Sequence, residues 1–287
     1  KERIGSLRSS PDGESNGLFN FPFQVNYTFS NLKTQAFFGT DLGDLIRFEI
    51  AQQLGVKHRI GDSGILQAGL LVSALTPEVW SDPYVTDRNR SSTDRDSIGV
   101  ELSWGNITGS DLDLSYKYRK IDIDSEKSGK FLGLSAQDRK LLERDGDQHK
   151  FEATYVLKMK GDHRLIPSFH YLIDDRDGDA RSNDEYAFKL TYAYLSGNPI
   201  SFTCNGFIGW SDYDERNPVP DFDGKKQEDD LYGLGATVYY KNPWDWRLWG
   251  SEPISFFLEG AWMERDANID FYDEQIIVGT LGAMFRW

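Results

Sequence analysis

The sequence is poor in cysteine and in long apolar runs. Cys204 is the single cysteine among 287 residues, so no disulfide can form within the chain, and it is expected to act as a small apolar side chain. The longest stretch without a charge, 190–211, has Gly197, Asn198 and Pro199 near its centre. A membrane-spanning helix needs roughly 20 mostly apolar residues. These shortages exclude a disulfide scaffold and a helical membrane protein.

Basic residues are in the minority. The chain has 46 Asp and Glu against 32 Lys and Arg, a formal net charge of -14. This charge repels phosphates, so no nucleic-acid partner is predicted, and no cofactor is predicted either. Aromatic residues make up 14% of the chain although hydrophobic residues make up only 39%. That pairing suits a sheet that is wet on one face and apolar on the other.

Alternation with a period of two is the strongest pattern. In 21–30, aromatic and aliphatic residues share one face while Gln24, Asn26 and Thr28 share the other, which is the strand period. The same pattern predicts about thirteen strands, most of about 10 residues or more, the length that a tilted strand needs to cross a bilayer. The expected strands are 21–30, 34–40, 45–58, 64–75, 96–106, 111–123, 147–159, 164–175, 184–196, 200–212, 229–240, 253–264 and 274–287.

The connections alternate between short and long. Short turns such as 30–33 and 160–163 are followed by long charged loops, of which 76–96 and 124–148 are examples. Short turns at one end and long loops at the other are typical of outer-membrane barrels. We therefore predict an all-β fold: a transmembrane antiparallel up-and-down β-barrel over 21–287, with 1–20 as an extracellular loop or N-terminal segment. A soluble β-sandwich or jelly roll is the alternative, but it gives no reason for this alternation.

The last residues favour the barrel. Gly279, Leu281, Ala283, Phe285 and Trp287 share one face, and the stretch resembles the C-terminal signature of bacterial outer-membrane proteins. That resemblance implies recognition by the barrel-assembly machinery and a location in the bacterial outer membrane. The segments 80–90 ("WSDPYVTDRNR") and 267–275 ("ANIDFYDEQ") also resemble an uncharacterised family of proteobacterial outer-membrane proteins, which implies no activity.

The number of strands raises a question of parity. Bacterial single-chain barrels have an even number of strands, whereas 21–30 and 274–287 run in the same direction if the chain ends on the periplasmic side. We therefore expect a first strand upstream of Lys1 and a total of about 14 strands. A total of 12 is the alternative, and 34–40 is the weakest of the expected strands.

The predicted barrel places one set of residues at the membrane–water interfaces and another set along the lumen. Tryptophan side chains suit membrane–water interfaces because the indole ring is amphipathic. The interfacial set is Trp104, Trp210, Trp244, Trp246, Trp249, Trp262 and Trp287. The residues predicted to line the lumen carry charges of both signs, and they are Arg47, Glu49, Gln53, Lys57, Glu101, Lys117, Arg119, Lys150, Glu152, Lys158, Lys189 and Glu259. Charged rings of this kind set the selectivity of pores, although the same charges could instead form a salt-bridged wall that conducts little.

The sequence gives weaker support to two further candidate sites, one for a metal ion and one for catalysis. Asp175, Asp177 and Asp179 could offer hard oxygen ligands to a divalent cation, but their spacing around Gly178 does not fit the known helical calcium loop, and a solvated loop is the simpler interpretation. His170 shares a strand face with Ser168, which allows a hydrolase hypothesis. A polar wall is the simpler interpretation there too, and no enzyme activity is predicted.

The predicted function is an outer-membrane channel for passive or facilitated diffusion of small hydrophilic solutes. The expected partners are outer-membrane lipid and lipopolysaccharide, the barrel-assembly machinery and a small polar solute. Two alternatives stay open: a translocation barrel that exports a macromolecule, and a plugged barrel with acidic binding loops.

Overall fold

The structure is a computed structural model of the 287-residue chain, and it describes residues 2–10, 13, 22–44, 49–73, 78–196, 199–241, 246–247, 250 and 252–284. For 41–44 and 49–50 the description covers the backbone alone. The strands and side-chain contacts of the fold and the site all belong to these residues.

Antiparallel strands make up nearly all of the regular structure. Thirteen of them pair in chain order, each with the next: β1 (Gln24–Thr28), β2 (Thr34–Asp44), β3 (Glu49–Arg59), β4 (Ile65–Ser73), β6 (Ser92–Gly105), β7 (Leu112–Ile123), β8 (Gly146–Tyr155), β10 (His163–Arg176), β11 (Asn183–Tyr194), β12 (Ile200–Arg216), β13 (Lys226–Lys241), β14 (Ser255–Ala267) and β15 (Glu274–Met284). The short strands β5 (Glu78–Trp80) and β9 (Leu157–Lys158) pair with β6 and β10. This order is an up-and-down meander.

The all-β antiparallel fold predicted from the alternation is confirmed. Each of the thirteen expected segments contains a strand, and 34–40 lies within β2, which pairs with both β1 and β3. The alternative total of 12 is therefore wrong for the described chain. The fourteenth strand, expected upstream of Lys1, lies outside the sequence and stays a prediction.

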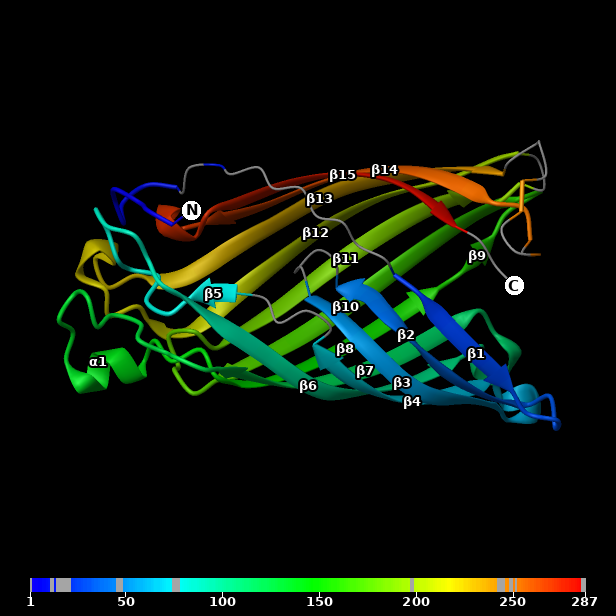
Figure 1. The fold of residues 1–287 in the computed structure, drawn as a ribbon, viewed down its shortest axis with the longest axis horizontal. Coiled ribbons are helices and arrows are strands. Elements are labelled where there is room, and N and C mark those ends of the chain that lie inside the picture. The colour runs from blue at the N-terminus through cyan, green and yellow to red at the C-terminus, as the bar shows by residue number, and fades with distance from the viewer. Residues whose placement is uncertain are drawn as a thin grey trace.

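The sheet curls into a cylinder, called the barrel below. In Figure 1 the strands β1 to β6 cross in front of β10 to β13 with the opposite slope, as expected when one tilted sheet wraps around an axis. β1 and β15 run in the same direction, because an even number of antiparallel steps joins them. The described residues show no pairing between these two strands.

Residues of alternate parity line opposite faces of the sheet. The outer face is apolar and exposed: Leu258 is 60% exposed, Leu234 64% and Leu281 80%. All of the main strands belong to one sheet, and no second sheet covers this face in the described chain. The sandwich alternative, in which such residues would be buried between two sheets, does not fit.

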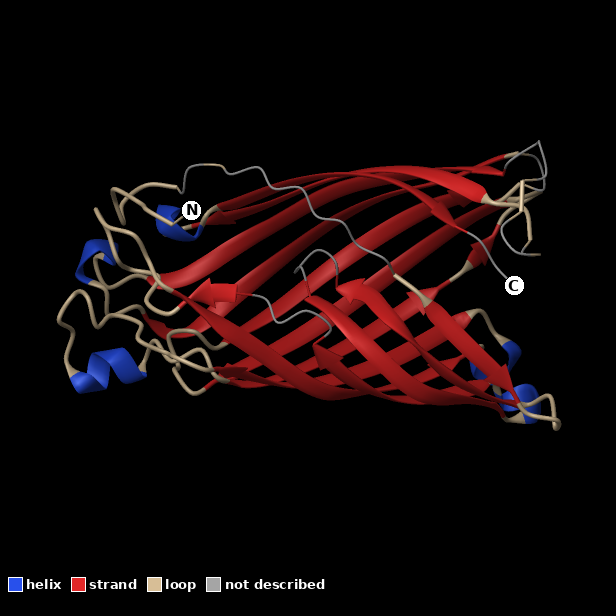
Figure 2. Ribbon diagram, in the orientation of Figure 1, coloured by secondary structure: helices blue, strands red, loops and turns tan. Residues whose placement is uncertain are grey.

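The two ends of the barrel differ. One, the turn end, has short connections that include the 3₁₀ turns η2 (Gly61–Ser63) and η3 (Ile107–Gly109). The other, the loop end, carries α1 (Ala136–Lys140), η4 (Pro220–Phe222), η5 (Asp270–Tyr272) and residues 2–10 (Figure 2). Among the described helices, none is both long and apolar enough to cross a membrane.

Candidate functional site

The inner face of the barrel carries a chain of polar contacts across neighbouring strands. Gln53 on β3 donates from Nε2 to Oε2 of Glu101 on β6, at 2.9 Å. The same oxygen lies 3.8 Å from Nζ of Lys117 on β7, and both of these charged side chains are mostly shielded. Lys150 on β8 stands directly opposite Lys117. The structure thus brings four of the predicted lumen residues together.

Other predicted lumen residues on this face lie apart from that chain of contacts. The Nζ atom of Lys57 sits 4.9 Å from the centre of the inward Phe37 ring. Glu152 accepts a long hydrogen bond of 3.4 Å from Thr154, and Arg119 is only 3% exposed.

The remaining members of the predicted lumen set lie elsewhere on the sheet, at the turn end, or outside the described residues. Lys189 is paired across the sheet with Ser168, and Glu259 with Thr280. Lys158 lies at the turn end, 2.5 Å from Oδ1 of Asp111, with a mostly exposed side chain. Glu49 is described by its backbone alone, opposite Asp44. Arg47 lies outside the described residues.

The hydrolase hypothesis rests on His170 and Ser168. His170 Nε2 lies 3.1 Å from Oε1 of Glu185, on the neighbouring strand β11. The Ser168 hydroxyl bonds to the hydroxyl of Thr154 on β8 at 3.0 Å. A serine nucleophile needs its histidine within hydrogen-bond reach, and here each side chain has a different partner.

A buried polar network lies at the loop end of the barrel, where the sequence analysis assigned no site. It is called the rim network and is built around Asp229, which is 3% exposed. Gln227 donates to the Asp229 carboxylate at 2.9 Å, and Arg265 approaches it at 3.2 Å. Arg181 in turn donates to Oε1 of Gln227 at 3.1 Å. The network joins β13, β14 and the 177–182 loop.

Arg181 remains a cation in this buried place. Burial by itself would lower the pKa of its guanidinium, but the facing Tyr272, Tyr213 and Tyr84 oxygens and the Asp229 charge raise that pKa overall. The guanidinium carbon lies 4.7 Å from the centre of the Tyr272 ring and 5.3 Å from that of Tyr213, which is cation–π geometry. A second buried pair nearby joins Arg176 to Asp174 at 2.5 Å.

The inward parity of the strands could have identified part of this network. Asp174, Glu185, Asp229 and Arg265 all lie on inner-face positions near the loop ends of their strands. Asp174, Glu185 and Asp229 fall within the predicted strands 164–175, 184–196 and 229–240 but were not included in the predicted lumen set, and Arg265 lies one residue beyond the predicted strand 253–264. Arg181 lies in a loop and had no such signal.

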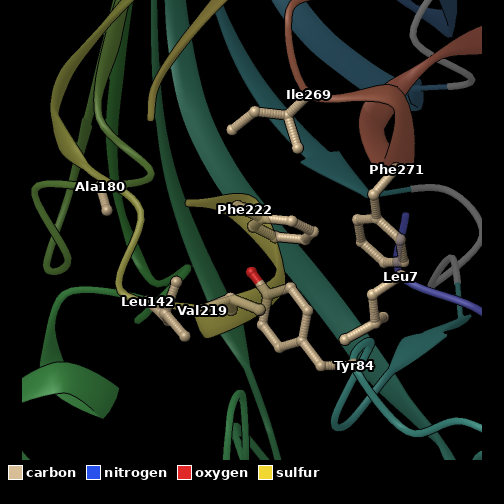
Figure 3. Packing of buried hydrophobic residues seen from close by; sticks show 8 residues of the cluster. All are labelled: Leu7, Tyr84, Leu142, Ala180, Val219, Phe222, Ile269 and Phe271. Atoms are coloured by element: carbon tan, nitrogen blue, oxygen red, sulfur yellow. The ribbon is translucent and has the colours of Figure 1, made fainter. Parts of the chain in front are cut away.

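Apolar residues from six separate segments meet at the loop end and form what is called the cap. The buried side chains come from residues 2–10, the loop before β6, the loops before β8 and β11, η4 and the segment that includes η5, as Figure 3 shows. They are Leu7, Tyr84, Leu142, Ala180, Val219, Phe222, Ile269 and Phe271. The ring centres of Tyr84 and Phe271 are 5.7 Å apart, and those of Phe222 and Phe271 are 5.5 Å apart. The long loops are thus packed against one another.

Hydrogen bonds satisfy several of the polar groups buried in the cap. The hydroxyls of Tyr84 and Tyr272 lie 2.8 Å apart, and Asn217 Nδ2 donates to the Tyr272 oxygen, also at 2.8 Å. Burial, reinforced by Tyr84, raises the pKa of Tyr272 well above its ordinary value, so this phenol stays neutral. The Asp82 carboxylate accepts from the backbone N–H groups of Gly129 and Phe131. Buried polar groups with partners make the cap a specific structure rather than a loose apolar contact.

Glycine is required at one point of the cap. A Cβ on Gly178 would lie 2.5 Å from the backbone nitrogen of Glu143 and 2.6 Å from the carbonyl oxygen of Leu141. Two backbones therefore approach too closely for any side chain. The contact fixes the 177–182 loop, and with it Arg181, against the segment that follows α1.

The outer face ends, toward the loop end, in paired tyrosines and aspartates. The Tyr118 hydroxyl donates to Asp147 at 2.7 Å and that of Tyr171 to Asp184 at 3.0 Å. Each aspartate lies on the neighbouring strand, two positions nearer the loop end than the residue opposite the tyrosine. A tyrosine with an apolar ring and a hydrated hydroxyl is the residue type found at membrane–water boundaries.

The predicted interfacial tryptophans are spread over both ends. Trp104, near the turn end, is 39% exposed and donates to the Ser63 carbonyl at 2.8 Å. Trp210 is 40% exposed and lies two residues before Asp212. Trp262 faces outward between Leu234 and Ile277. Trp246 is exposed in the 241–252 connection. Outside the described residues lie Trp244, Trp249 and Trp287.

The acidic loop residues do not converge. Asp175, Asp177 and Asp179 are exposed. Over the described part of the chain, no three His, Cys, Asp or Glu side chains are arranged to hold a metal ion. The divalent-cation hypothesis gains no support from this geometry.

The fold and the site define a class: an all-β, barrel-like protein with a polar lumen and a cap of packed loops. The chain belongs to the family described as "Protein of unknown function (DUF2860)", whose model matches residues 1–286. The resemblance to an uncharacterised family agrees with this membership. Comparison with curated proteins gave no significant match. Among solved structures, a "Bacterial polysaccharide outer membrane secretin" matches with a TM-score of 0.44 and 10% identity, over 92% of this chain and 89% of that one.

Proposed function

We propose that the protein is an outer-membrane channel through which small hydrophilic solutes diffuse. The observation that carries the proposal is the opposite chemistry of the two faces of one sheet. The outer face exposes large apolar residues along nearly every strand, and the inner face carries Lys, Arg, Glu and Gln.

Water is a poor solvent for such an outer face. Each fully buried Leu or Val side chain gains about 1.5–3 kcal/mol on leaving water, and the exposed set numbers dozens of side chains across the barrel. Soluble monomers rarely show apolar patches beyond a few hundred Å². The hydrocarbon of a bilayer is the covering that suits a continuous belt around a barrel, and the Tyr118–Asp147 and Tyr171–Asp184 pairs supply its polar boundary.

The proposed membrane is the bacterial outer membrane. Short connections at one end and long charged loops at the other match the periplasmic and extracellular sides of such barrels. In this orientation the loop end meets lipopolysaccharide, and the turn end faces the periplasm and the barrel-assembly machinery. Recognition through Phe285 and Trp287 stays a prediction, because both lie outside the described residues.

The cap favours a second candidate, a barrel closed by its own loops. Eight buried apolar residues hold the loops together over the loop end. Inward aromatic rings also occupy the lumen: Phe37 is 4% exposed, and the Phe207 ring lies where a side chain on Gly233 would be. In this case the acidic loops would act as a binding surface. The exporter and the hydrolase remain predictions with no contact that favours them.

Planar-bilayer recording separates the two candidates. Purified protein is reconstituted and compared with a variant in which Phe222 and Phe271 are replaced by Ser to open the cap. Ohmic steps from the native protein support the channel. Silence from the native protein with steps from the variant supports the closed barrel. Silence from both, with correctly folded protein, rules out a conducting lumen.

A further inference from the structure

The inner face of β7, β8, β10 and β11 is unusually basic for so acidic a chain. Besides Arg176, which pairs with Asp174, five cations lie on inward positions of these four strands, on a contiguous part of the wall called the basic strip: Lys117, Arg119, Lys150, Arg164 and Lys189. The whole protein carries a net charge of -14. Its acidic groups are therefore concentrated elsewhere, largely in the loops and on the outer face near the loop end.

The carboxylates on the same inner face are engaged by donors. Asp174 is paired with Arg176 at 2.5 Å, and Glu185 with His170 at 3.1 Å. Both acidic residues are buried, with Asp174 7% and Glu185 5% exposed. Such bonding and burial remove most of their negative field from the lumen water.

The two remaining carboxylates of these strands are also bonded. Asp113, near the turn end, accepts the backbone N–H of Asn106 at 2.7 Å. Glu152 accepts the Thr154 hydroxyl. On these four strands the cations outnumber the carboxylates, so the excess charge of this side of the lumen is positive whatever the individual contacts of the lysines.

One placement runs against stability. Lys117 and Lys150 are directly opposite each other on adjacent strands, and like charges in that position repel. Glu101 lies 3.8 Å from Lys117 on its other side and is shared with Gln53. Local violations of pairing rules tend to occur where function requires them. Two adjacent ammonium groups on the lumen wall would attract an anion.

We propose that the lumen prefers small hydrophilic anions, drawn along the basic strip. This inference rests on the proposed channel function and adds the charge class of its solute. The chemistry that fits is a compact solute with a carboxylate or another single anionic group. The opposite wall, β12 to β15, presents mainly small and uncharged inward residues midway along the strands, such as Asn205, Gly235 and Ala261. It would leave room for the solute, and between its two ends Glu259 is its inward charge in the described chain.

The test is the reversal potential of the reconstituted protein in a tenfold KCl gradient. The account expects a shift toward the chloride equilibrium potential. A Lys117→Gln, Lys150→Gln double variant should lose most of that shift, and Lys189→Gln alone should lose part of it. The matched control is Lys226→Gln, which changes an exposed lysine at the start of β13 and should leave the shift unchanged.

Liposome swelling with three sugars of similar size gives a second readout. Glucuronate should enter faster than glucose, and glucose faster than glucosamine, with the differences reduced in the double variant. Conductance with a preference for potassium, or equal entry of the three sugars, would overturn the anion preference while leaving the channel intact. Complete absence of conductance and swelling would overturn the channel, and the preference with it.

Discussion

Tyr84 and Tyr272 place their hydroxyl oxygens 2.8 Å apart although 188 residues separate them in the chain. Tyr84 belongs to the loop before β6 and Tyr272 to the loop before β15, so the contact joins early and late parts of the barrel. Asn217 and the Arg181 guanidinium meet the same tyrosine. The loops therefore form one packed unit, and in the proposed channel the opening of that unit would control conduction through the lumen.

The aromatic core of the cap should be sensitive to truncation. Phe222 is 3% exposed, and Phe222→Ala should destabilise the cap by about 3–5 kcal/mol, because it removes a buried ring from contact with Tyr84 and Phe271. Limited proteolysis should then cut the 124–145 and 217–225 loops faster while the strands stay protected. Phe222→Leu is the control, with a much smaller effect. Equal protease resistance of the native and Ala proteins would show that the cap is not held by this core.

The stability of the cap should fall as pH rises above the ordinary pKa of an aspartate side chain. Burial raises the pKa of Asp145, and the nearby charges of Asp122, Glu126 and Asp177 add to this, against a backbone hydrogen bond from Ile123 that lowers it. A carboxyl whose pKa is higher in the folded than in the unfolded state stabilises the fold below the unfolded value. That contribution is lost as pH rises through the folded value.

Asp145→Asn should therefore raise the midpoint of thermal unfolding at pH 7 and change it little near pH 4. The amide oxygen can still accept the Ile123 N–H at 2.6 Å. Asp179→Asn, on an exposed acid of a neighbouring loop, is the control. A larger stabilisation at pH 4 than at pH 7 would contradict the assigned sign.

Removing the partner of a buried carboxylate should be costly in the rim network. Arg265→Ala leaves Asp229, which is 3% exposed, without its salt bridge. Breaking a buried pair on one side typically destabilises by about 3–5 kcal/mol. Arg265→Ala combined with Asp229→Asn should recover part of this loss, as measured by urea unfolding in detergent micelles. Full additivity of the two changes would show that the pair does not interact.

A charge on the outer face should disrupt the barrel in a bilayer. Leu234→Arg places a guanidinium on the apolar belt, where Arg at the bilayer midplane costs about 2–4 kcal/mol and less nearer the interface. Glu228→Arg, at an exposed position near the loop end of the same strand, should have little effect. Unfolding in lipid vesicles measures both, and similar effects of the two changes would argue against a lipid-facing belt.

The strands could be predicted because their signal is local. In β7, for example, alternation alone places Leu114, Tyr116 and Tyr118 on one face and Lys117 and Arg119 on the other, and the register with β8 preserves both sets. A period of two leaves little choice once one face is apolar.

The cap could not be predicted in the same way. Tyr84, Leu142 and Phe222 are single apolar residues in charged loops, with no period to connect them. Their contacts depend on where the barrel brings the loops, which is non-local information. The sequence does carry one indication of the cap, which is the presence of isolated large apolar residues in otherwise polar loops. A loop that is fully exposed to water gains no stability from such residues.

The central claim is that neighbouring residues of one strand face lipid and water, and Cys204 tests it most directly. It is the single cysteine, exposed on the outer face of β12 and paired with Ala236, while the next residue, Asn205, faces the lumen. A fluorophore on Cys204 in vesicles should be quenched by doxyl lipid and not by iodide. A fluorophore on Asn205→Cys, in a Cys204→Ala background, should show the reverse. Equal quenching of both labels by iodide, with none by doxyl lipid, would contradict the account.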